Sequence, residues 1–307
     1  MPQITKPTNT LCKHCQQGKK TKTKFKSKEY STTRPLEIVH TDLVGKATTK
    51  GLKGERYFML LVDDYTRMTT VFFLKNESED FANFKIYKEM VEHEMDSKIK
   101  CLRSDNGGEF TSKECMDYWN NHGIKRQFFV ATTLQQNGVV ERMNRTLMEK
   151  ERFMLSGAEI GQEFWAEAVG TACYLVNRSP SSALGDKTPQ EVWTGKEPSL
   201  THLKVFGCDA YVHVPKENRS KMDKKAEKSI FIGYKDGLKS YKIWNPKNKK
   251  VVYSQDVVFK EMKDVVLPSK EEPKKIEFDL KDDESDSIEE QESEEEDPHT
   301  PVLRRLV

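Results

Sequence analysis

The chain has 307 residues, of which 36% are hydrophobic and 33% are charged, and its formal net charge is +2. This length allows one large domain and a smaller one, and the composition is that of a soluble protein with a modest core. No apolar run approaches the roughly 20 residues needed to cross a bilayer, which excludes a membrane-spanning protein.

The small net charge hides a strong asymmetry between the two ends. Residues 1–34 carry eight Lys and one Arg against one Glu, whereas residues 271–297 carry fifteen acids against three Lys. We expect the basic segment either to contact phosphates or to be a solvated arm. The acidic tail, taken as residues 265–307, has few apolar residues to bury and is expected to be disordered.

The start of the chain shows no secretory pattern, so we expect an intracellular, reducing compartment. The cysteines are then thiols or metal ligands instead of disulfides. They are Cys12, Cys15, Cys101, Cys115, Cys173 and Cys208.

Ordered structure is expected to begin at residue 35. Leu36, Ile38 and His40 recur with a period of two, which predicts a strand with Asp42 on the face of Ile38 and His40. Two apolar runs predict the other strands of a three-strand meander, over 57–62 and 68–74.

Ser78 is predicted to be the N-cap of a helix that runs to about Met95. A short strand over 99–102 then leads to Asp105. The next helix, over 113–122, places Cys115, Met116 and Trp119 on one side and is stopped by Gly123.

A fifth strand is predicted over 124–130, followed by a loop over 131–138 and a long helix over 139–155. The order is three strands, helix, strand, helix, strand, helix. It predicts an α/β, ribonuclease-H-like fold, in which a mixed five-stranded sheet is flanked by helices.

The last third of the chain changes character after two more predicted helices, over 162–177 and 189–193. Short β-rich runs predict a small, SH3-like β-barrel over residues 204–262: 204–206, 210–214, 228–233, 241–244 and 250–259. The predicted catalytic core covers residues 35–200.

Three acids stand in distinctive local contexts. Asp42 follows Ile38-Val39-His40-Thr41, and Asp105 precedes Asn106-Gly107-Gly108. Glu141 follows Gln136-Asn137-Gly138-Val139-Val140 near the start of the long helix. Singly, each acid fits a turn or the first turn of a helix. Together, these contexts and their order resemble the integrase core of copia-type long-terminal-repeat retrotransposons, over about residues 11–265.

The resemblance implies an integrase, a polynucleotidyl transferase that trims the 3′ ends of element DNA and joins them to target DNA. It implies that Asp42 bridges two Mg²⁺ or Mn²⁺ ions, while Asp105 holds one and Glu141 the other. Hard oxygen ligands suit both metals, and two such ions promote phosphoryl transfer. Asp63 and Asp64 are rival acids, but their place in a turn between strands favours a structural role.

Four side chains near these acids are candidate DNA contacts. Asn144 and Arg145 lie three and four positions after Glu141, on the same side of the helix. Arg103 and Arg142 complete the set. A surface ion pair is the alternative for each arginine.

Cys12 and Cys15 have the separation of two zinc ligands. The related zinc module has a His pair upstream, which is missing here, so we expect only an incomplete site and no bound zinc. The chain departs from the family pattern twice more, since Lys46 and Leu134 stand where the family usually has proline. The chain is expected to be one segment of a longer polyprotein.

The expected partners are double-stranded DNA, from element ends and target, and further copies of the chain. No membrane partner is expected, and action is expected in the nucleus, with a cytoplasmic particle stage. The alternatives are a decayed or domesticated DNA-binding protein, a plain nuclease, and a protein-interaction module built on the barrel and acidic tail.

Overall fold

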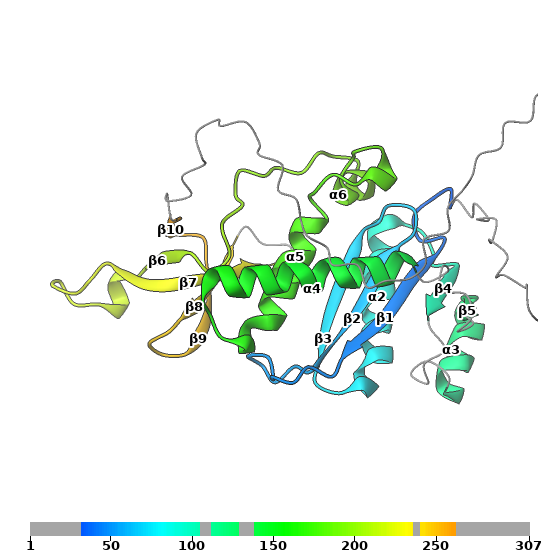
Figure 1. The fold of residues 1–307 in the computed structure, drawn as a ribbon, viewed down its shortest axis with the longest axis horizontal. Helices are drawn as coiled ribbons and strands as arrows, with labels where there is room; N and C mark the ends of the chain where they lie inside the picture. The colour runs from blue at the N-terminus through cyan, green and yellow to red at the C-terminus, as the bar shows by residue number, and fades with distance from the viewer. Residues whose placement is uncertain (1–31, 105–111, 129–137, 236–239, 262–307) are drawn as a thin grey trace, which may run out of the picture. The chain divides into compact units, whose positions relative to one another are not determined.

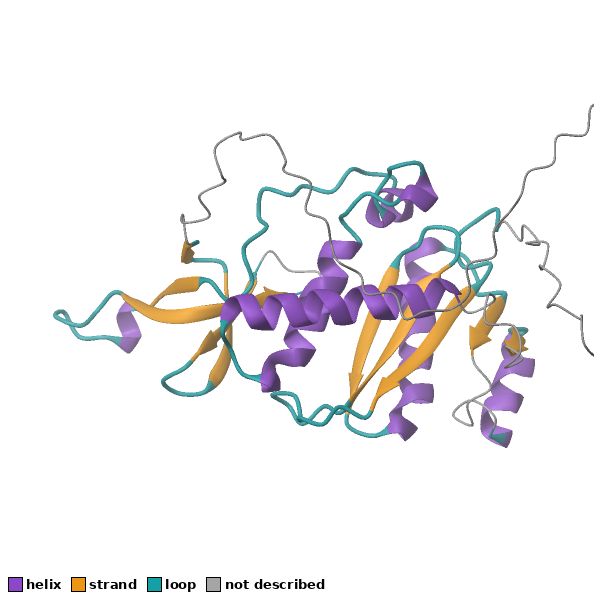
Figure 2. Ribbon diagram, viewed as in Figure 1, coloured by secondary structure: helices purple, strands orange, loops and turns teal. Residues whose placement is uncertain are grey.

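The computed structural model describes residues 32–104, 112–128, 138–235 and 240–261. All of them belong to one compact unit of the chain, residues 1–262. Their strands form two five-stranded sheets (Figure 2). The acidic tail and all but the last residues of the basic segment lie outside the described residues.

The first sheet contains the strands of the predicted catalytic core. They are β1 (Val39–Gly45), β2 (Tyr57–Asp63), β3 (Thr69–Leu74), β4 (Cys101–Ser104) and β5 (Lys125–Phe128). Their order across the sheet is β3-β2-β1-β4-β5. β1, β2 and β3 pair antiparallel, whereas β4 pairs parallel with β1 and β5. The predicted mixed five-stranded sheet is therefore confirmed, with β1 at its centre.

Helices cover both faces of this sheet, with α2 (Asp80–Met95) on one side and α4 (Gly138–Ala158) on the other (Figure 1). All seven residues of β2 are buried. A strand covered on both faces reads as a continuous apolar run, which is why 57–62 shows no alternation in the sequence.

The two faces have separate apolar clusters. On the first face, residues of β2 pack with α2 and α3 (Lys113–His122); this cluster includes Met59, Leu61, Phe84, Tyr87 and Trp119. On the second face, the other side of β2 packs with α4 and α5 (Trp165–Val176); this cluster includes Phe58, Leu60, Val62, Val140, Leu147 and Leu155. Helix α4 therefore lies over β1 and β2 through one apolar stripe, as its helical spacing predicts.

The second sheet follows α6 (Pro189–Thr194) and is antiparallel throughout. Its order is β10-β6-β7-β8-β9. The strands are β6 (Asp209–His213), β7 (Ala226–Tyr234), β8 (Tyr241–Asn245), β9 (Lys250–Ser254) and β10 (Val257–Lys260). The predicted SH3-like domain is therefore confirmed as a five-stranded antiparallel sheet.

Helix α5 joins the second sheet to the core. Ile232 of β7 is fully buried in the same cluster as Val169 and Ala172 of α5. The Phe164 and Trp244 rings meet edge to face with centroids 5.3 Å apart. One apolar cluster thus extends from α4 through α5 into the second sheet.

Several local predictions were wrong. Ser78 lies inside the 3-10 turn η1 (Glu77–Glu79), and α2 begins at Asp80 without a side-chain cap. The carboxylate of Glu79 organises this turn, because it accepts hydrogen bonds from the Lys75 backbone and the Asn76 side chain. Met116 is 45% exposed, since it lies about 100° around the helix from its buried neighbour Cys115.

Two errors concern the second sheet. Residues 204–206 form no strand, and the predicted single run over 250–259 is two strands, β9 and β10. The Val257 amide donates to the carbonyl of Gln255, so a tight turn separates β9 and β10.

The segment predicted as one helix over 162–177 begins as a 3-10 turn, η3 (Gln162–Phe164), before α5. Short 3-10 turns also occur at η4 (Ser182–Leu184) and η5 (Lys216–Asn218).

No helix within the described ranges is long and apolar enough to cross a membrane. The four cysteines of the described residues, Cys101, Cys115, Cys173 and Cys208, are free thiols.

Candidate active site

Asp42 lies in the middle of β1, where it stands opposite Leu60 of β2. Alternate residues of a strand face opposite sides of the sheet. Val44, two positions later, packs in the cluster beneath α4 and α5. Asp42 therefore lies on the face that α4 covers, and its side chain is half-buried there.

Asn144 of α4 contacts Asp42. Its Nδ2 donates to Oδ2 of Asp42 at 3.4 Å, although the two residues are 102 positions apart in the chain. The other amide atom, Oδ1 of Asn144, is buried and has no hydrogen-bond partner among the described residues. An unpaired buried carbonyl oxygen is costly, so this atom marks a place where a donor or a cation would be stabilising.

Glu141 lies three positions before Asn144 in the first turn of α4 and is exposed. Side chains three positions apart on a helix are neighbours, with Cβ atoms about 5–6 Å apart. The Asn144–Asp42 hydrogen bond therefore places Glu141 one helical turn from a residue that touches Asp42.

Asp105 lies outside the described residues. It follows Ser104, the last residue of β4, whose parallel partner is β1, with His40 opposite Arg103. Ser104 is buried, and its hydroxyl accepts a hydrogen bond from Nη2 of Arg126 at 3.0 Å. Sequence reasoning missed Arg126, because nothing in its local context distinguishes it from the neighbouring basic residues.

A metal ion bound by protein side chains alone is held by a cluster of His, Cys, Asp or Glu ligands, whereas Mg²⁺ needs only one or two carboxylates beside water and substrate oxygens. In the described part of the chain, which omits Asp105, no three His, Cys, Asp or Glu side chains are grouped closely enough to hold one. The oxygen ligands available here are the Asp42 carboxylate, which accepts a hydrogen bond from Nδ2 of Asn144, and the buried carbonyl oxygen of Asn144. Both are hard oxygen ligands of the type that Mg²⁺ and Mn²⁺ prefer, so the donor chemistry here fits these ions.

The candidate DNA-contacting arginines differ in their surroundings. Arg103 donates from Nε and Nη2 to Oε1 of Gln127, at 3.1 and 2.8 Å, so its guanidinium is held along β5. Arg142 and Arg145 are exposed on α4. The Arg142 guanidinium lies close to Gly138, where a Cβ would come within 2.8 Å of Nη1.

Asp63 is part of the turn between β2 and β3. It is fully buried and accepts hydrogen bonds from the Leu36 amide and from the amide and hydroxyl of Thr66. Burial raises the pKa of Asp63, against the opposing effect of these donors. These contacts hold the turn against the start of β1.

Asp64 belongs to a network that also involves β1. It accepts from Nε2 of His40 at 2.9 Å and from Nη1 of Arg67 at 3.2 Å. Burial by itself would raise the pKa of Asp64, but the hydrogen bond from His40 and the charge of Arg67 outweigh it and lower the pKa. Burial lowers the pKa of His40, so its ring is neutral near pH 7. The sequence placed His40 on the Asp42 face but did not reveal this pairing.

Cys12, Cys15 and Leu134 lie outside the described residues. Lys46, the other departure from the family pattern, follows Gly45 at the end of β1 and is exposed.

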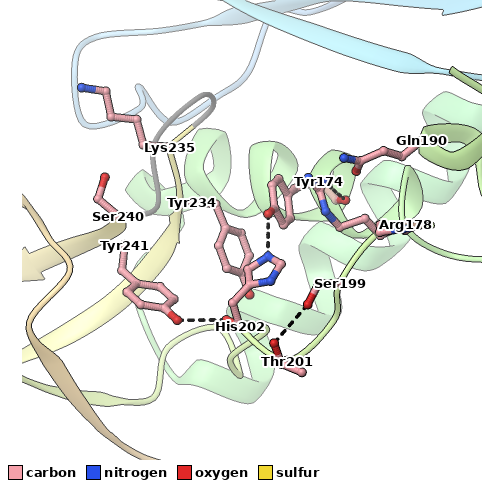
Figure 3. A pocket seen from close by; sticks show the side chains of 11 residues that line it. Tyr174, Arg178, Gln190, Ser199, Thr201, His202, Tyr234, Lys235, Ser240 and Tyr241 are labelled. Carbon is pink, nitrogen blue, oxygen red and sulfur yellow. Dashed lines mark hydrogen bonds between the residues drawn. The ribbon is translucent and has the colours of Figure 1, made fainter. Parts of the chain in front are cut away.

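A cavity of about 500 Å³ lies between α5 and the second sheet, away from these acids. Tyr174 and Tyr234 stack there with ring centroids 4.2 Å apart, and the Tyr174 hydroxyl lies 2.7 Å from Nε2 of His202 (Figure 3). The Tyr241 hydroxyl donates to the His202 carbonyl at 3.2 Å. None of the described residues that line this cavity is Asp or Glu, so it is not a carboxylate metal site.

Two protein families match this chain. Residues 32–132 match the integrase core domain, and residues 208–273 match the retroviral polymerase SH3-like domain. The fold also resembles the solved simian T-cell lymphotropic virus intasome in complex with PP2A regulatory subunit B56 gamma. That likeness has a TM-score of 0.50 at 13% identity, over 79% of this chain and 84% of the other. At this identity it supports the fold alone.

Relatives with higher sequence identity define the family of this chain. It is 46% identical over 250 residues to the retrovirus-related Pol polyprotein from transposon TNT 1-94 of Nicotiana tabacum, covering 81% of this chain and 19% of that protein. It is 33% identical over 233 residues to the corresponding polyprotein from transposon RE2 of Arabidopsis thaliana, covering 75% and 16%. The chain thus spans less than a fifth of the length of these relatives. It belongs to the retrovirus-related Pol polyproteins of retrotransposons, in the part that carries the integrase core and the SH3-like domain.

Proposed function

We propose that this segment is a catalytically competent integrase, which trims the 3′ ends of element DNA and joins them to target DNA. The proposed catalytic residues are Asp42, Asp105 and Glu141. The observation that carries the proposal is the hydrogen bond between Asn144 and Asp42, which holds the second turn of α4 beside the central strand, one turn after Glu141. Parallel pairing of β4 with β1 supports the inclusion of Asp105, the residue after that strand.

Asp42, Asp105 and Glu141 would hold Mg²⁺ or Mn²⁺, with the unpaired Asn144 carbonyl oxygen beside them. Two bound ions would supply Lewis acidity at the attacking and departing oxygens. Bound zinc is not part of the proposal.

The proposed reaction is substitution at a phosphodiester. In trimming, a water oxygen forms the new bond to phosphorus; in joining, the 3′-hydroxyl oxygen of element DNA does so. The bond from phosphorus to the departing 3′-oxygen breaks, the nucleophile loses its proton to solvent, and the departing oxygen takes up a proton from solvent to become a 3′-hydroxyl. The half-buried Asp42 side chain and the ordered turn of α4 would keep this geometry fixed, which lowers the entropic part of the barrier.

The remaining proposals follow from the same activity. We propose that Arg142 and Arg145, exposed on α4 beside Glu141, contact the DNA end, and that Asn144 and Arg103 also contact it. We also propose action in the nucleus, on duplex DNA, by an assembly of several copies, and domain boundaries at 35–200 and 204–262.

Strand transfer tests the proposal. A short blunt duplex of an element end, a supercoiled target and Mn²⁺ are incubated with the 307-residue chain. We expect joined products that fall at least about 100-fold in Asp42→Asn, Asp105→Asn and Glu141→Gln. Glu149→Gln changes an exposed carboxylate on the same helix and should retain activity.

Each outcome discriminates between functions. Equal product from wild type and Asp105→Asn would reject catalysis at this site and leave a DNA-binding protein. Shortened strands without joined products would favour a plain nuclease. Circular dichroism and thermal unfolding of each variant separate lost chemistry from lost structure.

A further inference from the structure

β1 and β3 terminate at the same end of the first sheet (Figure 1). A groove lined mainly by basic residues lies at this end. It is an open hollow of about 920 Å³. Its cationic lining residues come from the loop after β1 and from the residue after β3: Lys46, Lys50, Lys53, Arg56 and Lys75. We call this the basic groove throughout. Glu77 is the one acid among its described lining residues.

The cations of the basic groove lack carboxylate partners. The four lysines are exposed, Arg56 is half-buried, and within the described ranges none of the five forms an ion pair. Four lysines outside the groove do form ion pairs: Lys85 with Glu114, Lys98 with Glu92, Lys100 with Glu37, and Lys247 with Glu227. Five like charges around one hollow repel one another, so an anion bound among them would relieve that repulsion.

The loop that carries these charges has a fixed backbone. The Ala47 amide donates to the Arg56 carbonyl at 2.7 Å, and the Gly51 amide donates to the Glu55 carbonyl at 2.9 Å. Nε1 of Trp165 on α5 donates to the Thr49 carbonyl at 3.0 Å. The loop is thus bonded across its base and tied to α5.

The carboxylate of Glu55 is turned inward. Glu55 is 8% exposed and accepts from the Lys53 amide at 2.8 Å. The acid of the loop therefore supports its backbone, while the lysines are directed to solvent. Because the backbone that carries these lysines is already held in place, binding an anion costs little further backbone entropy.

We propose that the basic groove binds the sugar–phosphate backbone of duplex DNA without regard to sequence. The choice of DNA over other polyanions rests on the proposed integrase function. Asp42 lies three residues before Gly45 on β1, a distance of about 10 Å along the strand. A duplex is wider than this separation, so one duplex engaged near Asp42 can also reach the groove. Lysine ammonium groups are point charges that suit phosphate contacts but do not read bases.

The test measures binding of a fluorescent 30-base-pair duplex of arbitrary sequence to the 307-residue chain, by anisotropy. It is done without divalent metal and in an Asp42→Asn background, so the result does not depend on catalysis. The groove variant combines Lys46→Gln, Lys50→Gln, Lys53→Gln and Lys75→Gln. The matched control combines Lys85→Gln, Lys98→Gln, Lys100→Gln and Lys247→Gln, which changes the net charge equally but removes only ion-paired lysines.

We expect the groove variant to bind at least about tenfold more weakly near physiological salt. The slope of log affinity against log salt should become shallower by about 3–4, because each phosphate contact contributes about 0.9. The control variant should change the affinity less than about twofold. Each variant should bind a duplex of scrambled sequence as it binds the first duplex.

Two results would overturn the assignment. One is an equal loss in the groove and control variants, which would reflect net charge alone. The other is tighter binding of a 271–297 peptide than of the duplex, with dependence on the same four lysines, which would assign the groove to an acidic segment. If strand transfer fails but the groove variant still loses DNA binding while the control does not, the catalytic proposal is rejected and the DNA-binding role of the groove is retained.

Discussion

Glu92 shows how one carboxylate can join two elements at the scale of a single residue. It accepts hydrogen bonds from Nζ of Lys88 at 2.9 Å, Nζ of Lys98 at 3.1 Å and the Ile99 amide at 2.9 Å. Its side chain is 8% exposed. Burial by itself would raise the pKa of Glu92, but these donors outweigh it and lower the pKa. Glu92 therefore ties the end of α2 to the segment that leads into β4.

Because the folded pKa of Glu92 lies below its unfolded value, its stabilising effect is complete above the ordinary pKa of 4.5 and is lost as pH falls through the lowered value. We expect Glu92→Gln to lower the free energy of unfolding by about 3 kcal/mol at pH 7, since Lys88 is left buried and unpaired. The variant should also lose less stability on acidification below pH 5. Urea unfolding at several pH values measures both effects.

Glu94→Gln is the control, because Glu94 is exposed on the same helix. Its effect should stay within about 0.5 kcal/mol. An unchanged pH dependence in Glu92→Gln would contradict the account of Glu92.

Sequence reasoning at this scale found acids but not their contacts. The contexts of Asp42 and Glu141 can be read locally, whereas the hydrogen bond from Asn144 to Asp42 depends on where α4 crosses the sheet. The same holds for His40 and Asp64, which meet because β1 and β2 pair in a particular register. Contacts between distant positions follow from packing, which a single sequence does not display.

At the scale of elements, α3 was the helix whose ends the sequence predicted best. The bounds of α3 were predicted correctly at both ends. Gly123 ends it with a φ of 64°, a left-handed conformation that favours glycine, and the Ser112 hydroxyl accepts from the Cys115 amide at its start. The start of α2 was wrong because a 3-10 turn with its own carboxylate contacts precedes it.

Two glycines at helix ends should respond oppositely to alanine. Gly123→Ala should lower the free energy of unfolding by about 1 kcal/mol, because alanine strains at positive φ. Gly157→Ala in α4 should raise it by about 0.5 kcal/mol, since the helix gains propensity and a Cβ there meets nothing within 4 Å. Thermal or urea unfolding gives both values, and a loss in both variants would contradict the helical geometry at Gly157.

At the scale of the whole molecule, the core and the SH3-like domain share apolar packing. Ile232 and Phe206 complete the cluster that α4 and α5 begin. Lys242 of β8 also pairs with Glu167 of α5. The sequence indicated two domains, but the apolar residues of β7 resemble those of any buried strand, so their role at this junction could not be predicted.

Ile232→Ala tests this shared cluster. We expect the free energy of unfolding to fall by about 3 kcal/mol, because a fully buried side chain is removed. Calorimetry should show a single unfolding transition, whose midpoint temperature is lower in the variant. Ile86→Ala, at a 56% exposed position of α2, should shift it little. Two separable transitions, of which only one responds, would contradict a shared cluster.

This junction also constrains how such chains could recombine. Trp244 packs against Phe164, and Ile232 shares a cluster with α5, so the SH3-like domain is fitted to elements that precede the predicted domain boundary near residue 200. A chimera joined at that boundary would pair the second sheet of one chain with α5 of another, and their packing surfaces would not match. Exchange at about residue 160 would carry α5 and the second sheet together but would separate α5 from β2 and α4, which share its apolar cluster. Transfers between related elements are therefore expected to preserve the core and the SH3-like domain as one inherited block.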